Sequence, residues 1–126
     1  MVLPRLGQGS FRVLVTDAYT RRCAITGERT LPALDAAHIR PFSEKGLHVV
    51  SNGVLMRRDL HALFDKGYVT ITPDMNVEIS RWIKEEYENG RDYYRYHGGF
   101  IHFPDDIASR PSPEYLEWHN ANVYRG

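Results

Sequence analysis

From residue 34 onward, turn-forming residues divide the sequence into short apolar runs, and this punctuation limits what the chain can fold into. The runs at 34–39 and 53–56 have the length of short strands, and a polar loop over 40–51 separates them. Asp59 can begin a helix that ends at Gly67. The sequence therefore predicts the order strand, loop, strand, helix.

Further helices and strands are predicted on both sides of this segment, which makes the expected fold class α+β. They are a helix over 10–21 with Ser10 as its N-cap, a β-hairpin with strands at 68–72 and 77–79, a helix from Ser80 to about 89, and a helix over 113–122 that follows Ser112. No repeat or low-complexity tract divides the chain, so 1–126 is expected to be a single domain.

Composition places the chain among globular proteins that do not cross a membrane. Apolar residues make up 42% and charged residues 25% of its 126 residues, which excludes a disordered chain, a collagen and a coiled coil. No apolar run approaches 18 residues, and the N-terminus lacks the apolar segment of a secretion signal. The single cysteine, Cys23, cannot form an internal disulfide. We therefore expect a reducing, cytoplasmic setting.

The charges are balanced overall but divided along the chain. The formal net charge is zero, yet residues 1–67 carry 10 Lys and Arg against 6 Asp and Glu, while residues 68–126 carry 6 against 10. A polyanion would therefore be attracted to only one half of the molecule.

Two histidines and an asparagine stand out by their positions on the predicted elements. His38 ends the first strand, Asn52 opens the second strand 14 positions later, and His61 follows on the helix 9 positions after that. Asn52 can also be read as an ordinary turn residue before a glycine. The other histidines are interpreted as surface or satisfied core residues (His97, His102 and His119), apart from His48, for which a role at phosphate or metal stays open.

This series and the residues around it resemble the HNH endonuclease family. The motifs that carry the resemblance are CAITG at 23–27, HIRP at 38–41, SNG at 51–53 and LHALFD at 60–65. They are similar to a restriction-endonuclease-like subfamily that lacks zinc-binding CxxC pairs. The resemblance covers about 20–72, and residues 73–126 match only loosely to C-terminal extensions. It implies a ββα-metal core, which the predicted N-terminal helix, additional β-hairpin and C-terminal helices would flank.

The resemblance also implies a reaction and roles for the three residues. The reaction is hydrolysis of DNA phosphodiester bonds, leaving a 5′-phosphate and a 3′-hydroxyl, in restriction or defence against foreign DNA. His38 would be the general base, because a neutral imidazole can accept the proton of the attacking water. His61 would bind a divalent cation, Mg²⁺ or Mn²⁺ in preference to Zn²⁺ or Ni²⁺. Asn52 would hold the loop that carries His38.

The sequence departs from the family pattern in two places. Many HNH enzymes have a second metal ligand immediately before the base, where this chain has Ala37. Asp35 and Asp65 are the candidate replacements, and each can also be read as a structural residue. The second departure is the absence of paired CxxC motifs, of which Cys23 would be a remnant.

Basic residues near the motif are candidates for contacts with DNA phosphates, namely Arg40, Arg57 and Arg58, together with His48. DNA is accordingly the expected partner, and a second copy of the chain or a fused or partner domain would supply specificity. Two alternatives stay open. The chain could be a non-catalytic nucleic-acid-binding or interaction module on the same fold, or it could be an RNase.

Overall fold

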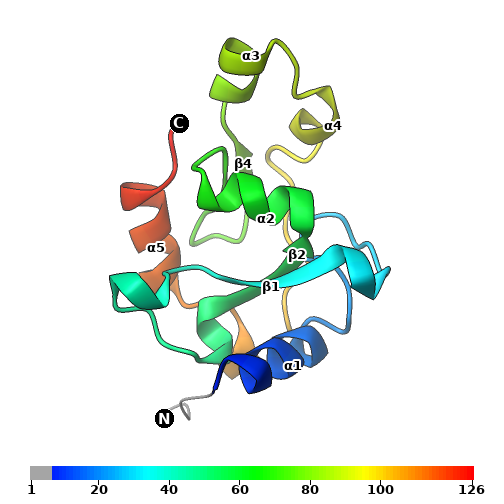
Figure 1. Ribbon diagram of the computed structural model, residues 1–126, viewed down its shortest axis with the longest axis vertical. Coiled ribbons are helices and arrows are strands. Elements are labelled where there is room, and N and C mark those ends of the chain that lie inside the picture. Colours follow the sequence, from blue (N-terminus) through cyan, green and yellow to red (C-terminus); the bar gives the residue numbers. More distant parts are fainter. Residues whose placement is uncertain (1–6) are drawn as a thin grey trace.

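The two apolar runs pair as an antiparallel hairpin, and a helix follows directly (Figure 1). The computed structural model describes residues 7–126. Strand β1 (Leu34–His38) pairs with β2 (Gly53–Arg57), and α2 (Arg58–Asp65) begins at the next residue. The predicted order of strand, loop, strand and helix is therefore confirmed, and the fold class is α+β.

The remaining elements extend this unit on both sides. They are α1 (Gln8–Ala18), β3 (Val69–Ile71), β4 (Val77–Ile79), α3 (Trp82–Tyr87), α4 (Arg91–Tyr94) and α5 (Pro113–Asn122), together with 3₁₀ turns at Leu31–Ala33, Phe42–Glu44, Val50–Asn52 and Ile107–Ser109. Strands β3 and β4 form a second antiparallel hairpin, as predicted.

Several helix boundaries differ from the prediction. Helix α2 begins at Arg58 after Arg57, so Asp59 lies inside the helix and does not begin it. Helix α1 begins at Gln8 after Gly7, so Ser10 lies inside the helix and is not its N-cap. The helix predicted from Ser80 is shorter and is followed by a separate helix, α4, because Glu88 and Gly90 both adopt the left-handed conformation that ends a helix.

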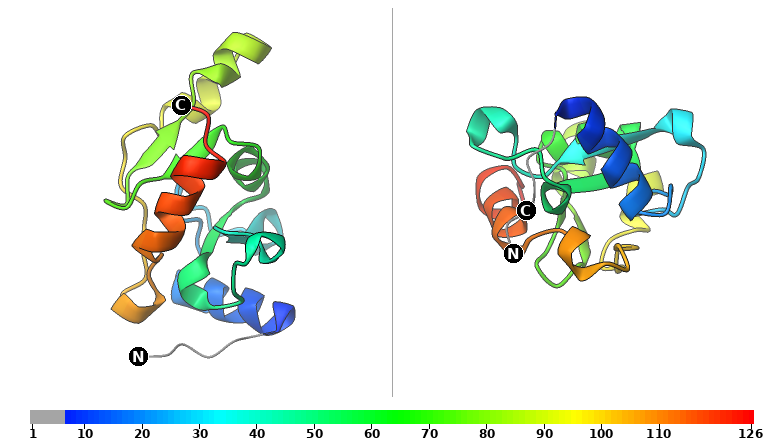
Figure 2. Two further views of the ribbon diagram at one scale, coloured as in Figure 1. Left: turned by 90° about the vertical axis from the view of Figure 1, so that its left-hand side faces the viewer. Right: turned by 90° about the horizontal axis from the view of Figure 1, so that it is seen from below.

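Helices α1 and α2 lie on opposite sides of the β1–β2 hairpin, while the β3–β4 hairpin, α3 and α4 form the other end of the molecule (Figures 1 and 2). No helix within residues 7–126 is long and apolar enough to cross a membrane. The prediction that the N-terminus is not a secretion signal falls on residues 1–6, which lie outside the described range.

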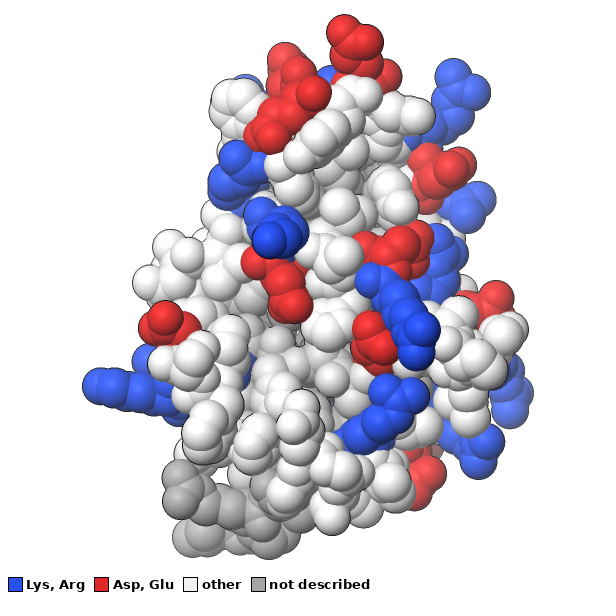
Figure 3. Space-filling model, in the orientation of Figure 1, with Lys and Arg blue, Asp and Glu red and all other residues white. Residues whose placement is uncertain are grey.

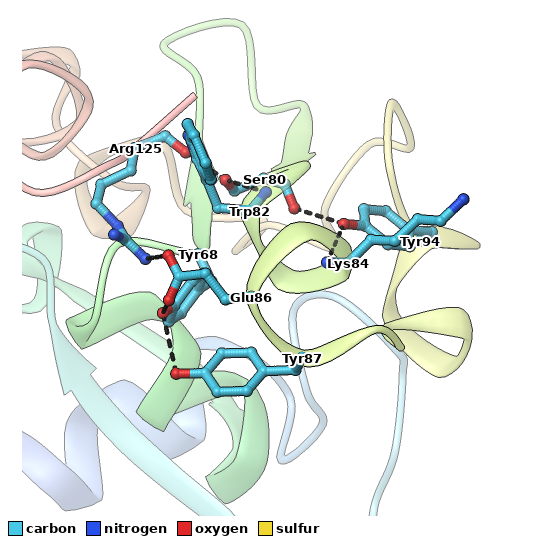
Figure 4. Close-up of polar contacts among 8 residues, drawn as sticks. All are labelled: Tyr68, Ser80, Trp82, Lys84, Glu86, Tyr87, Tyr94 and Arg125. Atoms are coloured by element: carbon cyan, nitrogen blue, oxygen red, sulfur yellow. Dashed lines mark hydrogen bonds and ion pairs between the residues drawn. The ribbon is translucent and has the colours of Figure 1, made fainter.

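A polar cluster fastens the C-terminal end of the chain to α3 and to the start of β3 (Figure 4). Tyr68 donates a hydrogen bond from its hydroxyl to Glu86 at 2.8 Å, and the guanidinium of Arg125 pairs with the other oxygen of Glu86 at 2.7 Å. The Ser80 hydroxyl donates to the Arg125 carbonyl. These contacts hold the residues after α5 against the β3–β4 end of the molecule.

Close packing of α1 on β2 depends on the absence of a side chain at Gly53. An ideal Cβ at this position would lie 2.5 Å from Cγ2 of Val15 and 2.9 Å from Cζ of Phe11. The side chains of α1 therefore rest directly on the backbone of the strand, and the Tyr19 hydroxyl donates to the Gly53 carbonyl at 3.0 Å. Because Gly53 pairs with His38 across the hairpin, this contact also brings α1 beside His38.

We expect Gly53→Ala to lower the free energy of unfolding by about 1 to 3 kcal/mol, because the new methyl group forces α1 away from the sheet. Urea denaturation measures the loss. Gly9→Ala is the matched control, since nothing lies within 4 Å of a Cβ at this α1 position, and it should be neutral or slightly stabilising. Equal stability of the two variants would show that the close packing of α1 on β2 does not depend on glycine at position 53.

His119 is a buried residue whose ring nitrogens are both satisfied, one of the two environments expected for it from the sequence. Its Nε2–H donates to the Phe64 carbonyl at 2.9 Å, and the Thr70 hydroxyl donates to its Nδ1 at 2.7 Å. The ring also stacks on Phe64 with the centroids 3.7 Å apart. His119 thus joins α5 to α2 and β3, and its burial lowers its pKa to about 4.

This depressed pKa predicts a loss of stability in acid. The unfolded chain binds a proton at His119 as the pH falls below about 6.5, whereas the folded chain does not until about pH 4, so unfolding becomes easier between these values. We expect wild type to lose up to about 3 kcal/mol more than His119→Gln across this window. Denaturation curves at several pH values measure the difference. His102→Gln, at an exposed position, should keep the wild-type slope, and identical slopes in wild type and His119→Gln would refute the prediction.

Candidate active site

A cavity of about 780 Å³ lies where α1, the end of β1, the 40–51 loop and α2 meet. His38 from β1 and His61 from α2 both line it, although they are far apart in the sequence. Phe11, Arg12, Phe42 and Asp65 are among the other residues that line it. The structure thus brings the two predicted site histidines to one cavity.

Asn52 is completely buried and joins β2 to both ends of the loop that precedes it. Its Oδ1 accepts from the Arg40 backbone N–H at 2.9 Å. Its Nδ2 donates to the Arg40 carbonyl at 2.9 Å and to the Leu47 carbonyl at 3.0 Å. One side chain therefore satisfies three backbone groups of a loop that begins two residues after His38.

The loop itself makes a tight turn inside this frame. The Gly46 N–H donates to the Pro41 carbonyl at 2.9 Å, and a Cβ at Gly46 would lie 1.7 Å from the Arg40 carbonyl oxygen, so only glycine fits there. Because of this turn, the chain reverses direction within a few residues, and His48 lies against His38.

His38 is held on one face and at one ring nitrogen. The Phe11 ring stacks on it with the centroids 4.0 Å apart and the planes within 6°. Its Nε2 lies 2.8 Å from Nδ1 of His48. Burial lowers the pKa of His38, and the neighbouring rings of His48 and His61 lower it further. His38 is therefore a neutral imidazole at neutral pH.

The other ring nitrogen of His38, Nδ1, has no hydrogen-bond partner among residues 7–126. Since His38 lines the cavity and Nε2 is engaged by His48, Nδ1 is the nitrogen through which it can act on a bound molecule. A neutral imidazole nitrogen of this kind can accept a proton from water.

His61 is placed between two carboxylates. Its Nδ1 lies 2.9 Å from Asp35, which belongs to β1, and its Nε2 lies 3.2 Å from Asp65, one helical turn further along α2. Hydrogen bonding to Asp65, followed by that to Asp35, raises the pKa of His61 to about 9 despite partial burial. Two imidazoles that line the same cavity thus have pKa values shifted in opposite directions.

The two carboxylates cannot both join His61 around one ion, because the ring nitrogens they contact point away from each other. Asp65 lines the cavity together with His61, whereas Asp35 does not. An imidazole nitrogen and a carboxylate oxygen are suitable donors for a divalent cation on the cavity side. No group of three or more potential ligands occurs within the described part of the chain, so water and substrate oxygens would have to complete the coordination.

The predicted basic residues lie outside the cavity and have partners of their own. Arg57 forms two hydrogen bonds with Asp59, at 3.0 and 2.7 Å, and Arg58 donates to Asp35 at 3.2 Å. Arg40 donates from Nε to the Glu44 carbonyl. The guanidinium of Arg40 also lies 5.1 Å from the ring centre of Trp118.

Three residues at the cavity were not predicted from the sequence. Arg12 and Phe11 come from α1, outside the recognised motif, and Phe42 is a 63% exposed aromatic side chain in the loop. Arg12 is the only Lys or Arg in α1, which is the one signal in the sequence that could have drawn attention to it.

We expect Asn52→Ala to lower the free energy of unfolding by about 3 kcal/mol, because it leaves three backbone groups of the loop without their buried partner. Chemical denaturation measures the loss, and hydrogen exchange of the Arg40 amide should become faster. Asn122→Ala is the control, since this exposed amide donates to the Trp118 carbonyl and should change stability by less than about 0.5 kcal/mol. Unchanged exchange at Arg40 would contradict the role of the buried amide.

Two comparisons with known proteins found similarities. Residues 23–72 match the model of the HNH endonuclease family, and this stretch contains His38, Asn52 and His61. No curated protein matches the chain. A solved structure described as a modification dependent TagI restriction endonuclease is similar in fold, with 21% sequence identity and a TM-score of 0.62.

The similar region covers 92% of this chain but 38% of that protein, so the present chain spans well under half of the TagI endonuclease's length. The fold likeness extends beyond the family match to α1 and to residues after 72. The match itself includes β1, the loop, β2, α2 and β3. Residues 23–72 are thus similar to the HNH endonuclease family.

Proposed function

We propose that the chain is a metal-dependent endonuclease that hydrolyses DNA phosphodiester bonds. The observation that carries the proposal is the meeting of His38 and His61 in one cavity, with the first imidazole neutral and the second flanked by carboxylates. General-base catalysis and cation binding require these two different environments.

His38 is the general base of the proposed reaction. Its Nδ1 accepts a proton from a water molecule as the water oxygen attacks the phosphorus atom. The bond from phosphorus to the 3′ oxygen breaks, and the departing oxygen takes a proton from solvent, leaving a 5′-phosphate and a 3′-hydroxyl. Phe11 fixes the plane of the imidazole, and Asn52 holds the adjoining loop.

His61, through Nε2, and Asp65 would hold the divalent cation, with Mg²⁺ or Mn²⁺ favoured by the carboxylate and by water and phosphate oxygens. When bound, the cation would neutralise the negative charge that develops on the phosphate and on the departing oxygen. Asp35 accepts the hydrogen bond of the opposite ring nitrogen and so orients the ring, as carboxylates commonly do behind metal-binding histidines. Zn²⁺ and Ni²⁺ also bind imidazole and are secondary candidates.

The substrate side of the proposal is DNA held by positive charges near the cavity. Arg12 lines the cavity, and Arg40, Arg57, Arg58 and His48 are the predicted further contacts. Acidic and basic side chains are interspersed over the face shown in Figure 3, which favours modest affinity for a polyanion.

The resemblance and the name of the TagI endonuclease support a proposed role in restriction. That protein is much longer than this chain, so specificity would come from a further domain, a partner or a second copy. The proposed cytoplasmic setting rests on the single cysteine, Cys23.

Nicking of supercoiled plasmid DNA in Mg²⁺ or Mn²⁺ tests the proposal. We expect His38→Ala to reduce the rate at least about 100-fold, because the base is lost, while the protein stays folded. His61→Ala should reduce the rate and also weaken Mn²⁺ binding measured by calorimetry. His102→Ala, an exposed histidine outside the cavity, should cleave like wild type.

The same assay separates the alternatives. A non-catalytic binding module would bind DNA in a salt-dependent way without cleaving it in any divalent metal. An RNase would degrade RNA in preference to DNA in a side-by-side digestion. Full activity in His38→Ala would remove the proposed base and with it this mechanism.

A further inference from the structure

His48 is held against His38 by the loop that Asn52 secures. The carbonyl groups on both sides of His48 accept hydrogen bonds from Asn52, Leu47 O from Nδ2 at 3.0 Å and Val49 O from the backbone N–H at 2.9 Å. The His48 ring stacks on Phe42 with the centroids 4.8 Å apart and the planes within 3°. Its position is therefore set from the backbone and from one ring face.

The His48 ring meets the His38 ring edge-on, as a hydrogen bond between imidazoles requires. The centroids are 4.9 Å apart and the planes are inclined by 64°, with Nε2 of His38 at 2.8 Å from Nδ1 of His48. A single proton lies between these two nitrogens, and it can be bonded to either ring.

Whether His38 can be a base depends on which of the two rings carries that proton. A neutral imidazole has one N–H. If His38 donates from Nε2, its Nδ1 carries a lone pair and can accept a proton from water. If His48 donates instead, Nδ1 of His38 already carries the proton and cannot act as a base.

We propose that His48 is a positioning residue that accepts the Nε2–H of His38 and thereby fixes the tautomer in which Nδ1 is free. This inference rests on the proposed function, because it assigns the proton according to the task of His38. When Nδ1 takes the proton of the attacking water, the resulting imidazolium still donates from Nε2 to His48, and a hydrogen bond from a charged donor is stronger than a neutral one. His48 therefore also stabilises the protonated base.

Two substitutions separate the hydrogen bond from the packing. His48→Phe keeps an aromatic ring to stack on Phe42 but removes the acceptor. His48→Asn loses the ring but keeps an oxygen, Oδ1, at the place of Nδ1. Thermal unfolding of both variants establishes that each is folded.

The direct measurement is the ¹⁵N NMR spectrum of His38 in the histidine-labelled chain near neutral pH, assigned with the help of His38→Ala. We expect the Nε2–H tautomer in wild type and in His48→Asn, and a mixture of tautomers in His48→Phe. This readout does not depend on DNA cleavage, so it tests the inference even if the protein proves inactive.

The kinetic expectation is a loss of turnover without a loss of substrate binding. His48→Phe should lower kcat for plasmid nicking about 10- to 100-fold with KM little changed, and His48→Asn should recover most of that loss. The inference is overturned if wild-type His38 is the Nδ1–H tautomer, or if His48→Phe leaves both the tautomer and kcat unchanged. Inactivity of wild type together with the expected tautomer would instead overturn the proposed function alone.

Discussion

The buried amide of Asn52 is the constraint on which the rest of the site depends. A loop that leaves β1 at His38 and returns to β2 exposes backbone polar groups to the interior, and those groups must be paired. Asn52 pairs three of them with one side chain, and its backbone N–H donates to the Val49 carbonyl. Because its amide has both donors and an acceptor, no apolar side chain and no carboxylate can satisfy the same set.

Two imidazoles of the same chemical type acquire different properties at this site because of their neighbours. An aromatic face and a second imidazole surround His38, and burial keeps it neutral. Two carboxylates flank His61 and favour its charged form. Opposite shifts of the pKa values of two imidazoles within one cavity mark this cavity as a candidate functional site.

The sequence was sufficient for the order of β1, β2 and α2, because turn residues separate short apolar runs there, and for the convergence of His38 and His61, because the recognised motif places both on that unit. It could not assign Asp35 and Asp65 to opposite nitrogens of His61, since that depends on side-chain directions across β1 and α2. The contacts of Phe11 and His48 with His38 were also missed, because each depends on how a separate segment packs in space.

Helix α1 has a consequence for where this unit ends. The family match begins at Cys23, yet the ring that covers one face of His38 comes from Phe11, a dozen residues earlier in the chain. The absence of a side chain at Gly53 is what lets that helix approach. A transplanted HNH segment cut at the borders of sequence similarity would leave its histidine uncovered on that face. A graft of this site onto another scaffold must therefore include the preceding helix together with the motif.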